Sequence, residues 1–160
     1  PQKGAASSRS VSVRGRRGGS PLILYFDTSA LVKLYVQEPG TAEARARLEA
    51  ASMVASSRVA YPEARAALAR RQREAGITRG ALARAVSALD RDFERLVVVE
   101  LSATVARRAG EVAERRALRG FDAIHLASAL EVEQLTGSAA GFCCFDDRLR
   151  EAASAEGLSV

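Results

Sequence analysis

Short apolar runs alternate with longer segments of helical period along most of this chain. Apolar runs without polar alternation are typical of strands that are buried on both faces of a parallel sheet. Their alternation with helices predicts an α/β fold in which helices cover both faces of that sheet. The predicted strands are 22–26, 53–56, 96–99, 141–145 and, more weakly marked, 158–160.

Start and stop signals bound the predicted helices. Pro39 and Gly40 end the first helix, Thr41 caps the second, and Pro62 lies in the first turn of the third. The third and fourth helices are separated by Gly76 and are expected to form a hairpin. The predicted helices cover 28–36, 41–49, 61–74, 78–93, 102–118, 121–135 and 146–156.

The net charge of +5 comes from the beginning of the chain. Residues 1–20 are rich in Gly, Ser and Arg and poor in large apolar side chains, which predicts a disordered arm. The arm is interpreted either as a basic tether for nucleic acid or as a segment from an upstream start or from expression. One domain is expected over 21–160, with balanced charge. The five basic residues of the arm are Lys3, Arg9, Arg14, Arg16 and Arg17.

Composition favours a soluble, cytoplasmic protein with no membrane partner. No apolar stretch approaches the roughly 20 residues that cross a bilayer, and no secretory signal peptide is visible. Cys143 and Cys144 are adjacent within a predicted strand, so their side chains are expected on opposite faces of the sheet. Such a pair does not readily form a disulfide, which is consistent with a reducing compartment.

Four acidic residues stand where a strand ends or a helix begins. Asp27 and Asp146 directly follow predicted strands, whose tips are the binding edge of a parallel sheet. Glu63 and Asp122 open predicted helices, where the helix dipole favours negative charge. Each acid alone is explained by helix capping or by the dipole. Together they predict a cation site.

The predicted site favours hard cations. Mg²⁺ and Mn²⁺ prefer oxygen ligands and retain several waters, which suits clustered carboxylates. The lone His125 is therefore interpreted as a partly buried helix residue bonded to backbone or to a neighbouring acid, with substrate contact as the alternative. Ser29 and Lys33 either support the site or simply cap and solvate their helix.

Taken together, the local sequences around these acids resemble the PIN-domain ribonucleases, and within them the VapC toxins. The resemblance covers residues 22–160 and implies a three-layer α/β/α, Rossmann-like fold. It further implies a five-stranded parallel sheet in the order 3-2-1-4-5, with the acids converging over the first and fourth strands. The segments that carry it are 27–33, Glu63, 122–127 and 146–149.

The resemblance also implies roles for individual residues. Asp27, Glu63, Asp122 and Asp146 match the metal-binding and catalytic acids of the family, and Arg148 follows the fourth acid as the family pattern expects. Two departures concern the fourth acid. Cys144 stands where the family often has a hydroxyl residue, and Asp147 adds a second carboxylate beside Asp146. We favour Asp146, since it stands at the strand tip.

By resemblance, the activity is endoribonuclease cleavage of RNA with Mg²⁺ or Mn²⁺ at a two-metal carboxylate site. The chain would be the toxin of a type II toxin–antitoxin pair, a homodimer silenced by a small VapB-like antitoxin. Three alternatives remain open. They are a PIN-like module that binds RNA or a partner without cutting it, a PIN nuclease of RNA processing, and, least favoured, an aspartyl-phosphate enzyme.

Overall fold

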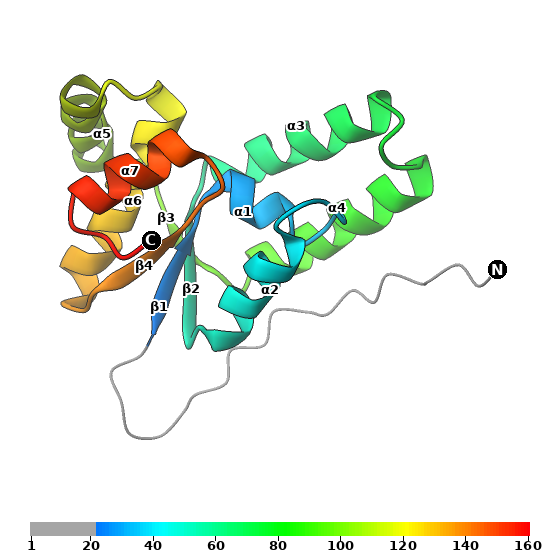
Figure 1. Cartoon of the computed structure of the whole chain (residues 1–160), viewed down its shortest axis with the longest axis horizontal. Helices are drawn as coiled ribbons and strands as arrows, with labels where there is room; N and C mark the ends of the chain where they lie inside the picture. Colours follow the sequence, from blue (N-terminus) through cyan, green and yellow to red (C-terminus); the bar gives the residue numbers. More distant parts are fainter. Residues whose placement is uncertain (1–21) are drawn as a thin grey trace.

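A parallel four-stranded sheet forms the centre of the computed structural model, which describes residues 22–160 (Figure 1). The strands are arranged in the order β3-β2-β1-β4. The arm predicted over 1–20 lies outside the described residues. The strands are β1 (Ile23–Phe26), β2 (Met53–Ser57), β3 (Val97–Val99) and β4 (Ala140–Cys143).

The strand order reverses direction beside β1. The chain moves outward from β1 through β2 to β3, and then returns to place β4 on the other side of β1. The register pairs Ile23 with both Met53 and Ala140, and it pairs Phe26 with Cys143. The carboxyl ends of β1 and β4 therefore lie at one edge of the sheet, which is the position where open α/β sheets bind ligands.

The predicted fifth strand is wrong. Only an isolated parallel bridge between Gly141 and Ser159 forms beside β4. The backbone N–H of Leu158 instead bonds to the carbonyl of Ala153 at the end of the last helix. Leu158 thus still belongs to the end of α7, and Ser159 alone pairs with β4, where its carbonyl accepts from the N–H of Phe142. The implied order 3-2-1-4 is confirmed for the strands that do form.

Helices cover both faces of the sheet, as the sequence predicts (Figure 1). Four of them, α1 to α4, pack on one face, and α5, α6 and α7 pack on the other. Helices α3 and α4 form the expected hairpin. The bounds are α1 Thr28–Val32, α2 Thr41–Ala50, α3 Ala60–Arg73, α4 Arg79–Phe93, α5 Ala103–Arg116, α6 Gly120–Thr136 and α7 Asp147–Ala155.

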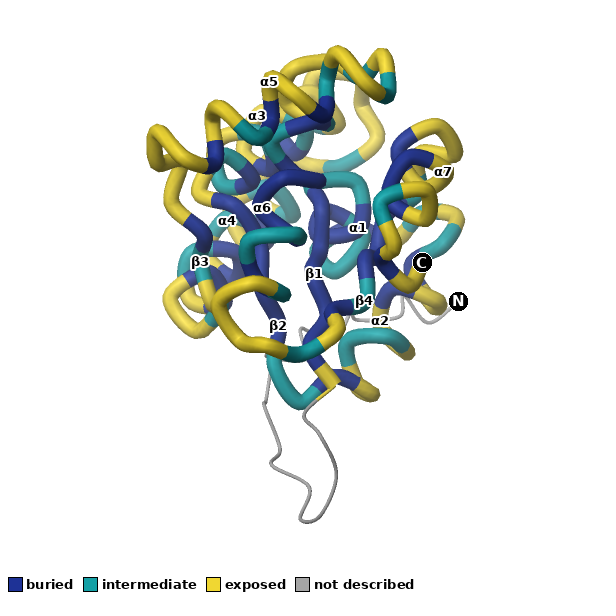
Figure 2. The backbone as a smooth tube through the Cα atoms, turned by 90° about the vertical axis from the view of Figure 1, so that its left-hand side faces the viewer, coloured by how far each residue is buried: buried dark blue, intermediate teal, exposed yellow. Residues whose placement is uncertain are grey.

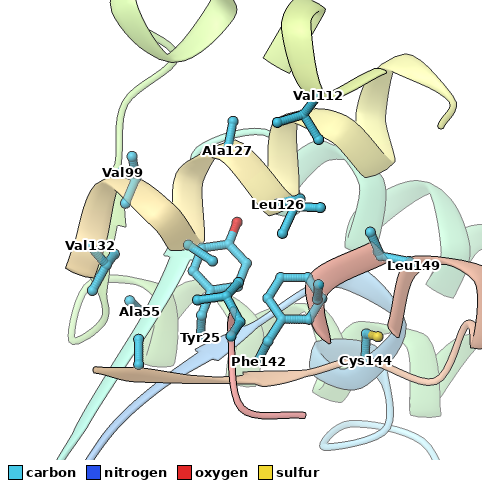
Figure 3. Packing of buried hydrophobic residues seen from close by; sticks show 14 of the residues in the cluster. Tyr25, Ala55, Val99, Val112, Leu126, Ala127, Val132, Phe142, Cys144 and Leu149 are labelled. Carbon is cyan, nitrogen blue, oxygen red and sulfur yellow. The ribbon is translucent and has the colours of Figure 1, made fainter. Parts of the chain in front are cut away.

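Strand β1 contributes to the core on both of its faces, and the tube in Figure 2 is dark blue along it. Ile23 and Tyr25 pack toward α5 and α6, whereas Leu24 and Phe26 pack toward α1 and α2. Figure 3 shows the Tyr25 ring beside Phe142, and the two rings stack with centroids 5.5 Å apart. Tyr25 is therefore both a core residue and, through its hydroxyl, a polar group inside the core.

The two cysteines lie on opposite faces of the sheet, as predicted. Cys143 packs toward α1 and α2, and Cys144 packs with the cluster around Tyr25. Both thiols are free and buried, and burial raises the pKa of each to about 12. Within the described part of the chain, no helix is both long enough and apolar enough to cross a membrane.

Helix α1 is shorter than the predicted span 28–36. It ends at Val32, after which the chain continues through tighter turns in which Leu34 and Tyr35 donate to carbonyls three residues earlier. Gly40 follows with φ of +88° and begins α2. A Cβ added at Gly40 would lie 2.6 Å from the Phe145 ring, so both the backbone and the space at this position require glycine.

Gly40→Ala should therefore lower the free energy of unfolding by about 1–3 kcal/mol, through backbone strain and displacement of Phe145. Urea unfolding followed by circular dichroism measures the change. Gly110→Ala is the matched control, because Gly110 lies within α5 with no atom near its added Cβ. That control should gain about 0.5–1 kcal/mol. Equal effects of the two changes would contradict the assigned role of Gly40.

Candidate functional site at the carboxyl edge of the sheet

Asp27 lies between β1 and α1, and it is buried with 4% of its surface exposed. Its backbone N–H continues the pairing with β4 by donating to the carbonyl of Cys143. Its side chain caps α1, with Oδ1 accepting from the N–H of Ala30 at 2.8 Å. The hydroxyl of Ser29 lies 2.8 and 2.9 Å from the two carboxylate oxygens. The capping interpretation of Asp27 is therefore confirmed, and the same contacts fix its carboxylate at the edge of the sheet.

Burial makes the charged form of Asp27 costly. It raises the pKa of this carboxyl to about 6, and the negative charge of Glu63 adds to the rise. His125, the N–H of Ala30 and the Ser29 hydroxyl oppose the rise without cancelling it. Any cation that enters the site would stabilise the charged form of this buried carboxylate.

Glu63 lies in the first turn of α3 and is half-buried. Its Oε2 accepts from the hydroxyl of Thr28 at 2.6 Å and lies 2.8 Å from Nε2 of His125. Burial by itself would raise the pKa of Glu63, but the hydrogen bonds from His125 and Thr28 outweigh it, so the pKa is lowered. The surroundings therefore lower the pKa of Glu63 and raise the pKa of Asp27 at the same edge of the sheet.

Asp122 and Asp146 complete the predicted set. Asp122 is in the first turn of α6, and Asp146 caps α7 by accepting from the N–H of Leu149 at 2.8 Å. Burial raises the pKa of Asp122, and the negative charges of Asp146 and Glu63 raise it further. The structure therefore brings Asp122 close enough to both acids for their charges to act on it.

Ser29 connects the tips of β1 and β4. Its hydroxyl bonds to Asp27 and also accepts from the backbone N–H of Phe145 at 2.8 Å. The predicted supporting role of Ser29 has this geometric basis. Lys33 has different partners, since its Nζ donates to Glu38 at 2.7 Å and to the carbonyl of Pro39 at 2.8 Å. Its contacts are those of a residue that fixes the turn before α2.

Asp147 and Arg148 have partners outside the set of four acids. Asp147 is exposed and forms an ion pair with Arg150 within α7. Arg148 donates to the backbone carbonyl of Ala117 at the end of α5. Of the two neighbouring aspartates, Asp146 is the one whose charge acts on Asp122. The preference for Asp146 as the fourth acid stays a prediction.

Sequence reasoning missed Thr28 and Tyr25. Thr28 bonds to Glu63 and lies 3.0 Å from Nε2 of His125, and the hydroxyl of Tyr25 lies 2.9 Å from Nδ1 of His125. The only available signal was the local one, namely a hydroxyl residue directly after Asp27 and a tyrosine in an otherwise apolar strand. Neither signal specifies partners that are 97 and 100 residues away.

The donor chemistry at this edge suits a hard cation. The grouped side chains are carboxylates, and the one histidine beside them turns its Nε2 to Glu63. As positioned within residues 22–160, no three of the Asp, Glu, His and Cys side chains are close enough to hold an ion as a ready-made set. The residues fit Mg²⁺ or Mn²⁺ by the type of their donor atoms, and the side chains would have to move closer together to form a complete ligand set.

Comparison with known proteins identifies relatives of this arrangement. The family model described as PIN domain matches residues 24–154. Ribonuclease VapC49 of Mycobacterium tuberculosis is 47% identical over 114 residues, which is 69% of this chain and 76% of that protein. Ribonuclease VapC46 of the same species is 34% identical over 138 residues, which is 86% of this chain and 95% of that protein.

Solved structures share the fold. Mycobacterium tuberculosis VapC20, described as a toxin that cleaves the sarcin-ricin loop, superposes with a TM-score of 0.59 at 21% identity and covers 84% of this chain and 95% of its own. A toxin–antitoxin complex from Klebsiella pneumoniae gives a TM-score of 0.52 at 20% identity and covers 73% of this chain and 82% of its own. At this identity, the two likenesses establish the fold.

The pKa of Asp27 predicts how the stability of the metal-free protein depends on pH. The folded state holds a proton on this group up to about pH 6, whereas the unfolded value is near 3.8, so stability falls as pH rises between these two values. Asp27→Asn removes the charge and should gain up to about 3 kcal/mol over the wild type at pH 8, with no gain at pH 4.

Urea unfolding in EDTA from pH 4 to pH 8 measures this difference between the two proteins. Asp147→Asn is the control, because that carboxylate is exposed and pairs with Arg150. A gap between wild type and Asp27→Asn that stays constant across the pH range would contradict the raised pKa.

Proposed function

Because this chain belongs to the PIN-domain family and has VapC ribonucleases among its relatives, we propose that it is a metal-dependent endoribonuclease of the VapC type. The observation that carries the proposal is the gathering of Asp27, Glu63, Asp122 and Asp146 at the carboxyl edge beside the β1–β4 reversal. A site rich in carboxylates at this position suits phosphodiester hydrolysis with Mg²⁺ or Mn²⁺.

The mechanism assigns these four carboxylates to hold the cations. When bound, Mg²⁺ or Mn²⁺ supplies an activated water and stabilises the charge that develops on the leaving 3′ oxygen. Ser29 and the N–H of Ala30 keep the Asp27 carboxylate in one orientation, and Thr28 and His125 do the same for Glu63. These contacts reduce the reorganisation that the site needs for the reaction.

The proposed biological role is that of the toxin in a toxin–antitoxin pair. Support comes from the VapC relatives and from the likeness to a toxin–antitoxin complex. We expect RNA as substrate, a small antitoxin whose tail covers the acidic edge with an arginine or another base, a homodimer, and a cytoplasmic location. A basic side chain would offset the same carboxylate repulsion that a cation offsets.

Cleavage of a mixed-sequence single-stranded RNA tests the activity. Purified antitoxin-free protein should cut with Mg²⁺ or Mn²⁺ and should not cut in EDTA. Asp27→Asn should lose more than about 100-fold in rate, because it removes a cation ligand itself and not merely an outer partner of a ligand. Asp147→Asn is the matched control and should cut at the wild-type rate, since that side chain pairs with Arg150.

Two results would redirect the proposal. Undiminished cleavage by Asp27→Asn would contradict the site assignment. RNA binding in EDTA, without any cleavage when metal is added, would instead support the alternative of a PIN-like module that binds RNA and does not cut it. A nuclease of RNA processing would share the chemistry and would be separated by the absence of a cognate antitoxin.

Metal binding should also raise thermal stability. Mn²⁺ at about 100 times its dissociation constant should add about 2.7 kcal/mol at neutral pH by mass action, because the folded state alone assembles the site. Differential scanning fluorimetry with and without Mn²⁺ measures this shift. Asp27→Asn should show a smaller shift than Asp147→Asn, and equal shifts in these two variants would argue against Asp27 as a ligand.

A further inference from the structure

A chain of hydrogen bonds runs from the hydrophobic core to the acidic edge. The hydroxyl of Tyr25 lies 2.9 Å from Nδ1 of His125, and Nε2 of His125 lies 2.8 Å from Oε2 of Glu63. Tyr25 and His125 are both buried, with 0% and 2% of their surfaces exposed. Figure 3 shows the Tyr25 hydroxyl pointing toward α6, the helix that carries His125. The histidine thus connects β1, α6 and α3.

The direction of each hydrogen bond follows from the chemistry of the partners. Oε2 of Glu63 already accepts from the Thr28 hydroxyl and lies 2.8 Å from Nε2 of His125, so this oxygen acts as the acceptor and Nε2 carries the hydrogen of the second bond. Thr28 donates its own hydrogen to Glu63 and offers a lone pair to the same Nε2–H. Burial raises the pKa of Tyr25 well above its usual value, so the phenol keeps its proton and can donate it to Nδ1. The Tyr25 bond therefore favours the tautomer that Glu63 requires.

Both donors meet on one oxygen of Glu63. Thr28 at 2.6 Å and His125 at 2.8 Å both bond to Oε2, and within the described residues no hydrogen bond is made by Oε1. A carboxylate that is held at one oxygen presents the other in a fixed direction. Without these two hydrogen bonds, the long, half-buried side chain of Glu63 in the first turn of α3 would be free to adopt several rotamers.

We propose that His125, oriented by Tyr25, is a positioning residue that holds Glu63 Oε2 and leaves Oε1 free to serve as a cation ligand. This inference rests on the proposed metal-dependent function. His125 itself touches neither the cation nor the RNA in this role. It acts through Glu63, in the way that outer-shell partners orient metal ligands.

Two substitutions at position 125 separate the two ring nitrogens. The side-chain nitrogen of Gln reaches the place of Nε2 and can still donate to Glu63, whereas that of Asn reaches only the place of Nδ1. His125→Asn should weaken Mn²⁺ binding about 10- to 100-fold, and His125→Gln should stay much closer to the wild type. Isothermal titration with Mn²⁺ gives the dissociation constants, and RNA cleavage gives the rates.

A third variant keeps the inference testable if substitution at 125 lowers stability. Tyr25→Phe removes one oxygen and keeps the ring stacked on Phe142. It should weaken Mn²⁺ binding several-fold while circular dichroism stays native. Placing His125→Asn on a Glu63→Gln background should add little further loss, because the histidine acts through that carboxylate.

The outcomes are distinguishable. If the wild type neither binds Mn²⁺ nor cuts RNA, the result contradicts both the proposed function and this inference. If the wild type does both, the inference alone is overturned by wild-type Mn²⁺ affinity in folded His125→Asn or Tyr25→Phe. Equal losses in His125→Asn and His125→Gln would also overturn it, since a purely structural histidine predicts no preference between the two amides.

Discussion

The crowding of negative charge at one edge of the sheet is the constraint on which the rest of this structure depends. Parallel pairing of β1 with β2 and β4 brings the ends of these strands together. Asp27 and Asp146 follow β1 and β4, and Glu63 and Asp122 stand in the first turns of α3 and α6. Like charges at short range in a low dielectric oppose folding. The surrounding structure offsets this charge. The first turns of α1 and α7 donate to Asp27 and Asp146, Thr28 and His125 bond to Glu63, and Asp122 lies at the positive end of the α6 dipole.

Hydrogen-bond donors offset the cost of negative charge to different extents at Asp27 and at Glu63. Asp27 receives an N-cap bond and a hydroxyl, yet its burial is so complete that its pKa stays raised to about 6. Glu63 is less buried and receives both an imidazole and a hydroxyl, which lower its pKa. One edge thus contains a carboxylate that readily keeps its proton and another that readily loses it. Local environment, and not residue type, sets this difference.

Sequence patterns predicted the fold and the location of the acids more completely than the contacts between them. Strands and caps are local, so the run that ends at Phe26 and the capping role of Asp27 were readable directly. The fifth strand did not form because Leu158 still belongs to the end of α7, where its N–H bonds to the carbonyl of Ala153, and only Ser159 pairs with β4. The network of Thr28, His125 and Glu63 could not be predicted for a different reason, since tertiary packing alone brings these elements together.

Burial of Asp27 also links stability to function. A carboxylate that is costly to ionise in the metal-free fold gains more from a cation than an exposed one does, because the same burial that raises its pKa strengthens its attraction to positive charge. Under the proposed function, the metal-free protein is therefore strained near neutral pH, and the cation-bound form relieves that strain. Natural sites often retain such costly charges because removing them abolishes the activity, even though it stabilises the fold.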